Sequence, residues 1–222
     1  MSGISGPKII TSGCVLSLDA ADKLSYKGSG TTWKDLSGNN NTGTLTNGPT
    51  FNAGNQGSIS FDGTDDYVTS PSSNSFAFGT GDFTLEIWIY PQSFSTYLHM
   101  ISLPAQSTFG LKADVSNGVI YFYSPSFDTY GFTSGWTLSL NTWNCVVFKR
   151  ESSTAYAFLN GVSKGSKSGF TNNFTSQILN IHYGHPTEWA QCRISRVSIY
   201  NRALSAAEVL QNYNATKTRF GL

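Results

Sequence analysis

The sequence has few charged residues, and the charges that it has are balanced. Only 12% of its 222 residues are Asp, Glu, Lys or Arg, and the formal net charge at pH 7 is +1. No segment gathers basic residues into a patch. Binding to nucleic acid or to an anionic membrane depends on such a patch. The composition therefore argues against both classes of partner.

Long apolar runs are also missing. No segment approaches the roughly 18 consecutive apolar residues that a membrane-spanning helix needs. The opening, Met1 to Lys8, lacks the apolar core and the small-residue cleavage site of a secretory signal peptide. We therefore expect a protein that is made in the cytoplasm and does not cross a membrane.

Cysteine is scarce and follows no metal-binding or redox pattern. Cys14, Cys145 and Cys192 are odd in number, and none belongs to a CxxC pair. We expect three reduced and mostly buried thiols, with a single disulfide as the alternative.

The sequence is rich in glycine and aromatic residues, which are arranged in short alternating segments. The clearest strand is Phe83–Tyr90, which places Phe83, Leu85, Ile87 and Ile89 on one face. Other segments of this kind are 9–18, 58–63, 99–103, 109–113, 119–123, 143–150, 154–159, 162–164, 178–183 and 192–200. Short strands separated by turn residues are typical of an all-β sandwich.

Two further segments have a different character. One short helix is expected at 204–213, because Ser205 and Glu208 have the spacing of a capping box. The segment Lys27–Asn55 is rich in Gly, Ser, Thr and Asn, with scattered apolar residues. We interpret it as an ordered long loop that packs on the sandwich.

Six sequence blocks, in family order, resemble the laminin-G-like jelly-roll domains of the concanavalin A-like group. The blocks are Trp33–Phe51, Phe61–Val68, Phe83–Ile89, Trp143–Arg150, Asn160–Gly161 and Ile194–Val209. The resemblance implies an antiparallel two-sheet jelly-roll sandwich with one short C-terminal helix. The domain would occupy residues 13–214, with an N-terminal arm at 1–12 and a C-terminal tail at 215–222.

The two ends of the domain suggest a narrower group. Gly13–Asp22 and Leu210–Leu222 are similar to the ends of such domains in virion structural proteins of tailed phages. This implies a non-enzymatic capsid decoration component on the virion surface, made in the host cytoplasm. Its partners would be other capsid or tail proteins, and a homo-oligomer remains open. The alternative is a tail adhesin that binds host surface glycan, and a more distant one is a glycoside hydrolase.

The resemblance also raises the question of catalysis. Glycosidases of this superfamily use two carboxylates about 5 to 10 Å apart, carried at alternate positions of a strand. Here Glu86 is followed at the alternate positions by Trp88 and Tyr90, so the second acid is missing. We therefore assign no catalytic residue and expect no enzymatic activity.

Calcium is the metal that the resemblance brings forward, although no cofactor is required by the sequence. Asp62, Asp65 and Asp66 match the acids with which family members hold Ca²⁺, and oxygen ligands suit that cation. Ser195 and Arg196 stand where the family has a second acidic position, and we expect the arginine to repel a cation. Other metals are not indicated, because His182 and His185 lack a third ligand.

A sugar-binding site is the last candidate. Lectin-like sites stack an exposed aromatic ring against a sugar and add hydrogen bonds from loops. Aromatic residues gather at 121–130 and at 183–189, and alternation buries about half of such rings. We select Tyr130 and Trp189 as the candidate glycan-binding residues.

Overall fold

The protein is an antiparallel sandwich of two sheets with one C-terminal helix. The computed structural model describes residues 6–94, 97–103, 109–114, 118–124, 127–131, 136–183 and 189–222. Every strand pairing in it is antiparallel, and β1 pairs with β16 outside the main strand order of one sheet. The expected all-β two-sheet class is therefore confirmed.

The first sheet carries the longest strands, and its order along the sheet is β14-β13-β12-β7-β16-β5-β4. Its strands are β4 (Thr50–Asn52), β5 (Ser58–Phe61), β7 (Phe83–Pro91), β12 (Asn144–Glu151), β13 (Thr154–Leu159), β14 (Val162–Ser168) and β16 (Cys192–Tyr200), with β1 (Cys14–Asp19) paired to β16.

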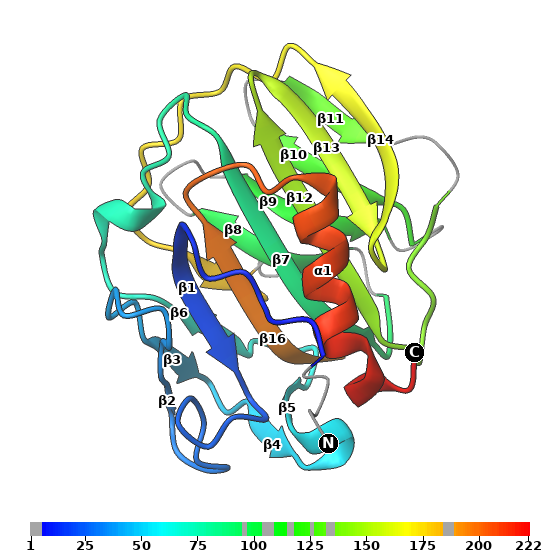
Figure 1. The fold of residues 1–222 in the computed structure, drawn as a ribbon. Coiled ribbons are helices and arrows are strands. Elements are labelled where there is room, and N and C mark those ends of the chain that lie inside the picture. The colour runs from blue at the N-terminus through cyan, green and yellow to red at the C-terminus, as the bar shows by residue number, and fades with distance from the viewer. Residues whose placement is uncertain are drawn as a thin grey trace, which may run out of the picture.

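The second sheet lies behind the first in Figure 1 and has the order β11-β10-β9-β8-β15-β6-β3-β2. Its strands are β2 (Thr32–Trp33), β3 (Gly43–Thr46), β6 (Tyr67–Thr69), β8 (Tyr97–Leu103), β9 (Phe109–Asp114), β10 (Ile120–Ser124), β11 (Phe127–Gly131) and β15 (Asn180–Ile181).

The segment Lys27–Asn55 is not the single long loop that the composition predicts. It contains β2, β3 and β4, so it contributes to both sheets. These strands are two to four residues long, too short for apolar alternation to reveal them. Their positions depend on cross-strand pairing, as with Leu45 opposite Val68.

The alternation in β7 divides its side chains between two hydrophobic clusters. Phe83, Leu85, Ile87 and Ile89 are buried in the main core between the sheets, as predicted. Trp88 points to the opposite face, where it joins a second cluster with residues of the C-terminal segment. Both faces of the central strand are therefore covered.

The second cluster is closed by α1 (Ala206–Thr216), which lies across the first sheet in Figure 1. Its N-cap is Ser205, and both hydrogen bonds of the expected capping box with Glu208 are present. A 3₁₀ turn, η3 (Lys217–Phe220), follows, and Phe220 stacks on Trp88 with ring centroids 4.1 Å apart. Two further 3₁₀ turns are η1 (Gly54–Gln56) and η2 (Asn74–Phe76).

Residues on either side of the predicted domain boundaries pack against this helix. The Ile10 amide donates to Asn212 Oδ1 at 2.8 Å, and Gln211 Nε2 donates to the Lys8 carbonyl at 2.7 Å. Residues 215–222, set apart as a tail in the sequence, form the end of α1 and the η3 turn. The boundaries at 12 and 214, and any partner contact by these segments, stay predictions.

The structure bears on two expectations from the sequence, the state of the cysteines and the presence of membrane-spanning helices. Cys14, Cys145 and Cys192 are free thiols, and the last two are buried, as expected. In the described part of the chain no helix has the length and apolar character to span a membrane.

One buried cation, Arg150, holds together two loops beside the first sheet. Arg150 on β12 has no exposed surface, and its guanidinium donates to the carbonyls of Gly79, Gly81 and Asn172. It also lies 5.0 to 5.7 Å from the ring centroids of Phe83, Phe170 and Phe174. Burial lowers the pKa of Arg150 to about 10.

We predict that Arg150→Met lowers the free energy of unfolding by about 3 kcal/mol, because buried carbonyls lose their donors. Urea denaturation followed by tryptophan fluorescence measures the change. The exposed Lys34→Met variant is the matched control, with an expected change within about 0.5 kcal/mol. A loss below about 1 kcal/mol for Arg150→Met would contradict the role given to this cation.

Candidate functional site

The loop between β5 and β6 gathers three carboxylates at one edge of the sandwich. The carboxylate oxygens of Asp62, Asp65 and Asp66 lie within 4.8 Å of one another. Asp62 and Asp65 are exposed, whereas Asp66 is buried. The structure therefore brings together the three acids that the sequence selected.

Hydrogen bonds within the loop hold this arrangement. Asp62 Oδ1 accepts from the Thr64 amide at 2.8 Å, as in a typical Asx turn, and Asp66 Oδ2 accepts from the Asp62 amide at 3.0 Å. Gly63 has a φ of +80°, and a Cβ there would lie 2.9 Å from the Gln191 amide nitrogen. The loop is thus packed closely against the segment before β16.

His182 joins the loop to that segment. Its buried ring has Nδ1 3.0 Å from the Asp66 carbonyl and Nε2 2.8 Å from the Ala190 carbonyl. Burial lowers the pKa of His182, while the two carbonyls and the charge of Asp62 oppose this effect. Both ring nitrogens are engaged with carbonyls, so His182 serves as a structural link here; His185 lies outside the described residues.

An aromatic cluster lies directly beside this link. The Trp189 ring centroid is 5.9 Å from that of His182 and 6.1 Å from that of Tyr183, which it meets edge-on. Tyr183 is 40% exposed and contacts Tyr67, in β6, at a centroid distance of 5.0 Å. Trp189, one of the two predicted glycan-binding residues, therefore contacts the same histidine ring as the backbone carbonyl of Asp66, a predicted metal ligand.

The other predicted glycan-binding residue is Tyr130. Tyr130 lies in β11, and its side chain is outside the described part of the chain. Sequence reasoning placed Tyr183 in an aromatic segment without selecting it, and it passed over Tyr67. Their contact depends on β15 pairing beside β6, with Ile181 opposite Val68, which local sequence does not reveal.

The electrostatics of the loop favour a cation. Burial raises the pKa of Asp66, and repulsion from Asp62 and Asp65 adds to this increase. A divalent ion would relieve the repulsion, and clustered carboxylate oxygens are the ligands that Ca²⁺ prefers. The three acids of this loop therefore fit the role of Ca²⁺ ligands.

Arg196, which the sequence suggested would repel a cation, is paired with an acid in the structure. Arg196 Nη1 donates to Asp19 Oδ2 at 3.0 Å, on the face of the first sheet that α1 covers. Asp19 also binds Arg219 Nη1 at 2.8 Å, so one carboxylate is shared by two guanidinium groups, and repulsion of a cation at the loop by Arg196 stays a prediction.

Glu86, the acid considered for catalysis, is enclosed beneath α1. It is 1% exposed, and its Oε2 accepts a hydrogen bond from Asn212 Nδ2 at 3.0 Å. Burial raises the pKa of Glu86. Its neighbours across the sheet are Val147 and Ser198, so neither adjacent strand places a second acid opposite it.

The sequence profile of the concanavalin A-like lectin/glucanases superfamily matches residues 62–210. The chain belongs to this superfamily. The match spans the acid loop, the aromatic cluster and most of both sheets, and it agrees with the two-sheet architecture. No curated protein sequence matches the chain significantly.

Solved structures share the fold at low sequence identity. The binding domain of Paraclostridial Mosquitocidal Protein 1 has a TM-score of 0.71 and 20% identity, over 92% of this chain and 52% of its own. The receptor binding domain of botulinum neurotoxin C/D mosaic serotype has a TM-score of 0.72 and 16% identity, over 92% and 51%.

A third neighbour is an enzyme. Trypanosoma rangeli sialidase in complex with sialic acid has a TM-score of 0.70 and 13% identity, over 98% of this chain and 36% of its own. The chain thus spans about half of the two toxin domains and about a third of the sialidase. These likenesses show the fold alone.

Calcium should stabilise the protein through the acid loop. With a dissociation constant of about 0.1 mM, typical of extracellular modules, 10 mM CaCl₂ would add about 2.7 kcal/mol and raise Tm by about 5–10 °C. Differential scanning calorimetry with CaCl₂ or with EDTA measures this shift. Asp65→Asn should abolish it, whereas Asp22→Asn, outside the cluster, should leave it intact. Equal midpoints in CaCl₂ and EDTA would remove calcium from the site.

Proposed function

We propose that the chain is a non-enzymatic binding module that holds a glycan at the edge formed by Asp62–Tyr67, Tyr183 and Trp189. The observation that carries the proposal is the contact of Trp189 with Tyr183, together with the His182 ring that links Trp189 to the loop of three clustered carboxylates. Aromatic rings contact the apolar face of a sugar, and nearby oxygens accept hydrogen bonds from its hydroxyl groups. Both types of group are present at this edge.

The arrangement of the sheets supports this choice of surface. On the first sheet, α1 and η3 cover the outer face around Trp88, which is fully buried. At the edge, by contrast, Tyr183 keeps 40% of its surface and Asp62 and Asp65 are exposed. Loops at the ends of a rigid sandwich are a common location for binding residues.

The burial of Glu86 supports a binding role rather than hydrolysis. Its carboxyl group is bonded to Asn212 and lies beneath α1, where a sugar would have to displace the helix. The similarity to the sialidase covers only about a third of that enzyme. Glycoside hydrolysis is therefore the alternative function, and not the first one.

We further propose that the module is displayed on a phage virion, most simply as a decoration component of the capsid. The support is the similarity of Gly13–Asp22 and Leu210–Leu222 to the ends of such domains in phage virion proteins. Two of the structural neighbours are named as binding domains, one of a mosquitocidal protein and one of a neurotoxin, which favours the alternative of a tail adhesin for host glycan.

Trp189→Ala should reduce glycan binding about 5- to 30-fold, because the loss of one stacked ring removes about 1–2 kcal/mol. A glycan array identifies the sugar, and isothermal titration calorimetry with that sugar measures the change. Tyr183→Ala should act similarly, and Tyr130→Ala tests the second predicted residue. The control is Tyr156→Ala, a half-buried tyrosine on β13 of the first sheet. Unchanged affinity in the Trp189 and Tyr183 variants would exclude this edge.

Cryo-electron microscopy of the particle that carries the protein tests the virion proposal. We expect density of this sandwich at regular positions on the capsid. Density confined to the tail would replace the decoration role with the adhesin role. If purified particles lack the chain by mass spectrometry, the virion proposal is wrong, although the binding module survives.

A further inference from the structure

The arginines of the chain differ in how their charge is compensated. Arg150 donates to three backbone carbonyls, Arg196 and Arg219 pair with Asp19, and Arg202 pairs with Glu208. Each of these four guanidinium groups therefore has acceptors within the protein. Among the described residues, which include every arginine, Arg193 is the exception: it has neither a hydrogen-bond acceptor nor a carboxylate partner.

Arg193 is nevertheless held firmly in place. On β16 its cross-strand neighbours are Tyr90 of β7 and Ser60 of β5. Its guanidinium carbon lies 3.9 Å from the Tyr90 ring centroid and 5.9 Å from that of Trp143. Trp143 is fixed in turn, because its Nε1 donates to Asn55 Oδ1 at 3.0 Å. The planar group thus rests on an aromatic support.

The two ends of this guanidinium group have different surroundings. The Nε atom is buried and has no hydrogen-bond partner. Neither terminal nitrogen is a buried atom without a partner, and the side chain is partly exposed. A stacked guanidinium is attracted to the faces of the rings, but this stacking leaves its N–H donors without acceptors. The exposed fork is therefore open to an acceptor from outside the chain.

We propose that Arg193, supported by Tyr90, is a subsite for the carboxylate of an acidic sugar. A planar guanidinium matches a carboxylate through two parallel hydrogen bonds, which a lysine cannot reproduce. Ser60 lies opposite Arg193, and the exposed Thr50 lies opposite Ser60, so hydroxyl groups continue the same row. These hydroxyls are suited to the polar groups of the sugar ring.

The position of Arg193 relates this subsite to the edge already described. Cys192 pairs with Phe61, the residue before Asp62, so Arg193 and the acid loop lie at the same end of the sandwich. The assignment of the ligand as a sugar rests on the proposed function. The carboxylate specificity rests on Arg193 itself.

The test is NMR observation of the arginine Nε–Hε signals of the intact chain during titration with N-acetylneuraminic acid. We expect the Arg193 signal to shift with millimolar affinity, and the shift to be at least tenfold weaker with the methyl ester of the same sugar. Inorganic phosphate and glucuronate serve as further probes. Binding of glucuronate supports a general carboxylate site, whereas phosphate binding as tight as that of the sugars would overturn the sugar assignment.

Variants of Arg193 complete the experiment. Arg193→Gln should abolish the preference for the acid over its methyl ester, and Arg193→Lys should restore only part of it. Lys27→Gln removes the same charge from an exposed site and should leave the preference unchanged. An unshifted Arg193 signal, or an unchanged preference in Arg193→Gln, overturns the inference. Loss of binding in Trp189→Ala reports separately on the proposed function, so either idea can fail alone.

Discussion

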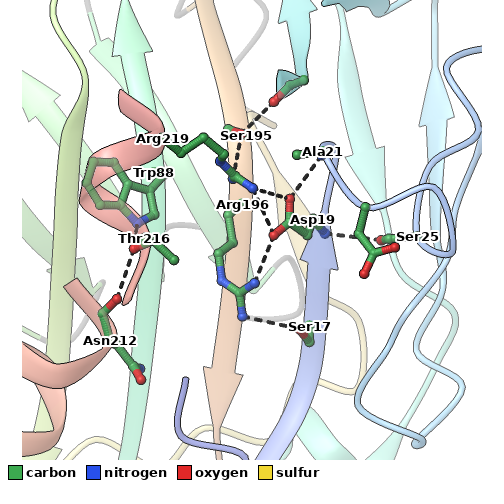
Figure 2. Close-up of polar contacts among 12 residues, drawn as sticks. Ser17, Asp19, Ala21, Ser25, Trp88, Ser195, Arg196, Asn212, Thr216 and Arg219 are labelled. Carbon is green, nitrogen blue, oxygen red and sulfur yellow. Dashed lines mark hydrogen bonds and ion pairs between the residues drawn. The ribbon is translucent and has the colours of Figure 1, made fainter. Parts of the chain in front are cut away.

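Asp19 is the residue on which the closure of the first sheet depends. It accepts hydrogen bonds from Arg196 Nη1 at 3.0 Å and from Arg219 Nη1 at 2.8 Å, and thereby joins β1, β16 and η3 (Figure 2). Arg219 also donates to Ser195 Oγ, which in turn donates to the Gly57 carbonyl. All three charged side chains are almost fully buried, and a buried cation without its partner is costly. The network therefore joins the C-terminal segment to the sheet beside the contacts of Trp88 with Phe220 and Thr216.

The closed outer face determines where a ligand can bind. Trp88 Nε1 donates to Thr216 Oγ1 at 3.1 Å, so the end of α1 is bonded directly to the central strand (Figure 2). With α1 in this position, Glu86 and its neighbours lose contact with solvent. The exposed functional groups then remain at the loops and at the part of the sheet around Arg193. This agrees with a fold whose members share the sandwich but differ in function, since function depends on the residues placed at its margins.

The sequence predicted the long elements because each of them has a strong local signal. Phe83–Pro91 shows alternation over nine residues, and Ser205 with Glu208 defines the start of the helix. The short strands of residues 27–55 were missed, since a two-residue strand has no periodicity and is defined only by its partner. The same reason explains the site: the acid loop is contiguous in sequence and was recognised, whereas Tyr67 meets Tyr183 only through strand pairing. The partner of Arg196 was likewise unpredictable, because Asp19 is distant in sequence.

His182 contacts both the acid loop and the aromatic cluster and so connects them. Its ring bridges the carbonyls of Asp66 and Ala190, its amide donates to the Met100 carbonyl at 3.1 Å, and Trp189 contacts its ring. The residue adopts a φ of +59°, which a non-glycine residue tolerates only where its surroundings fix it. A neutral imidazole has one N–H, so only one of the two carbonyls can accept a full hydrogen bond at a time. The acid loop and the Trp189 ring therefore share one buried support at this edge, the His182 ring.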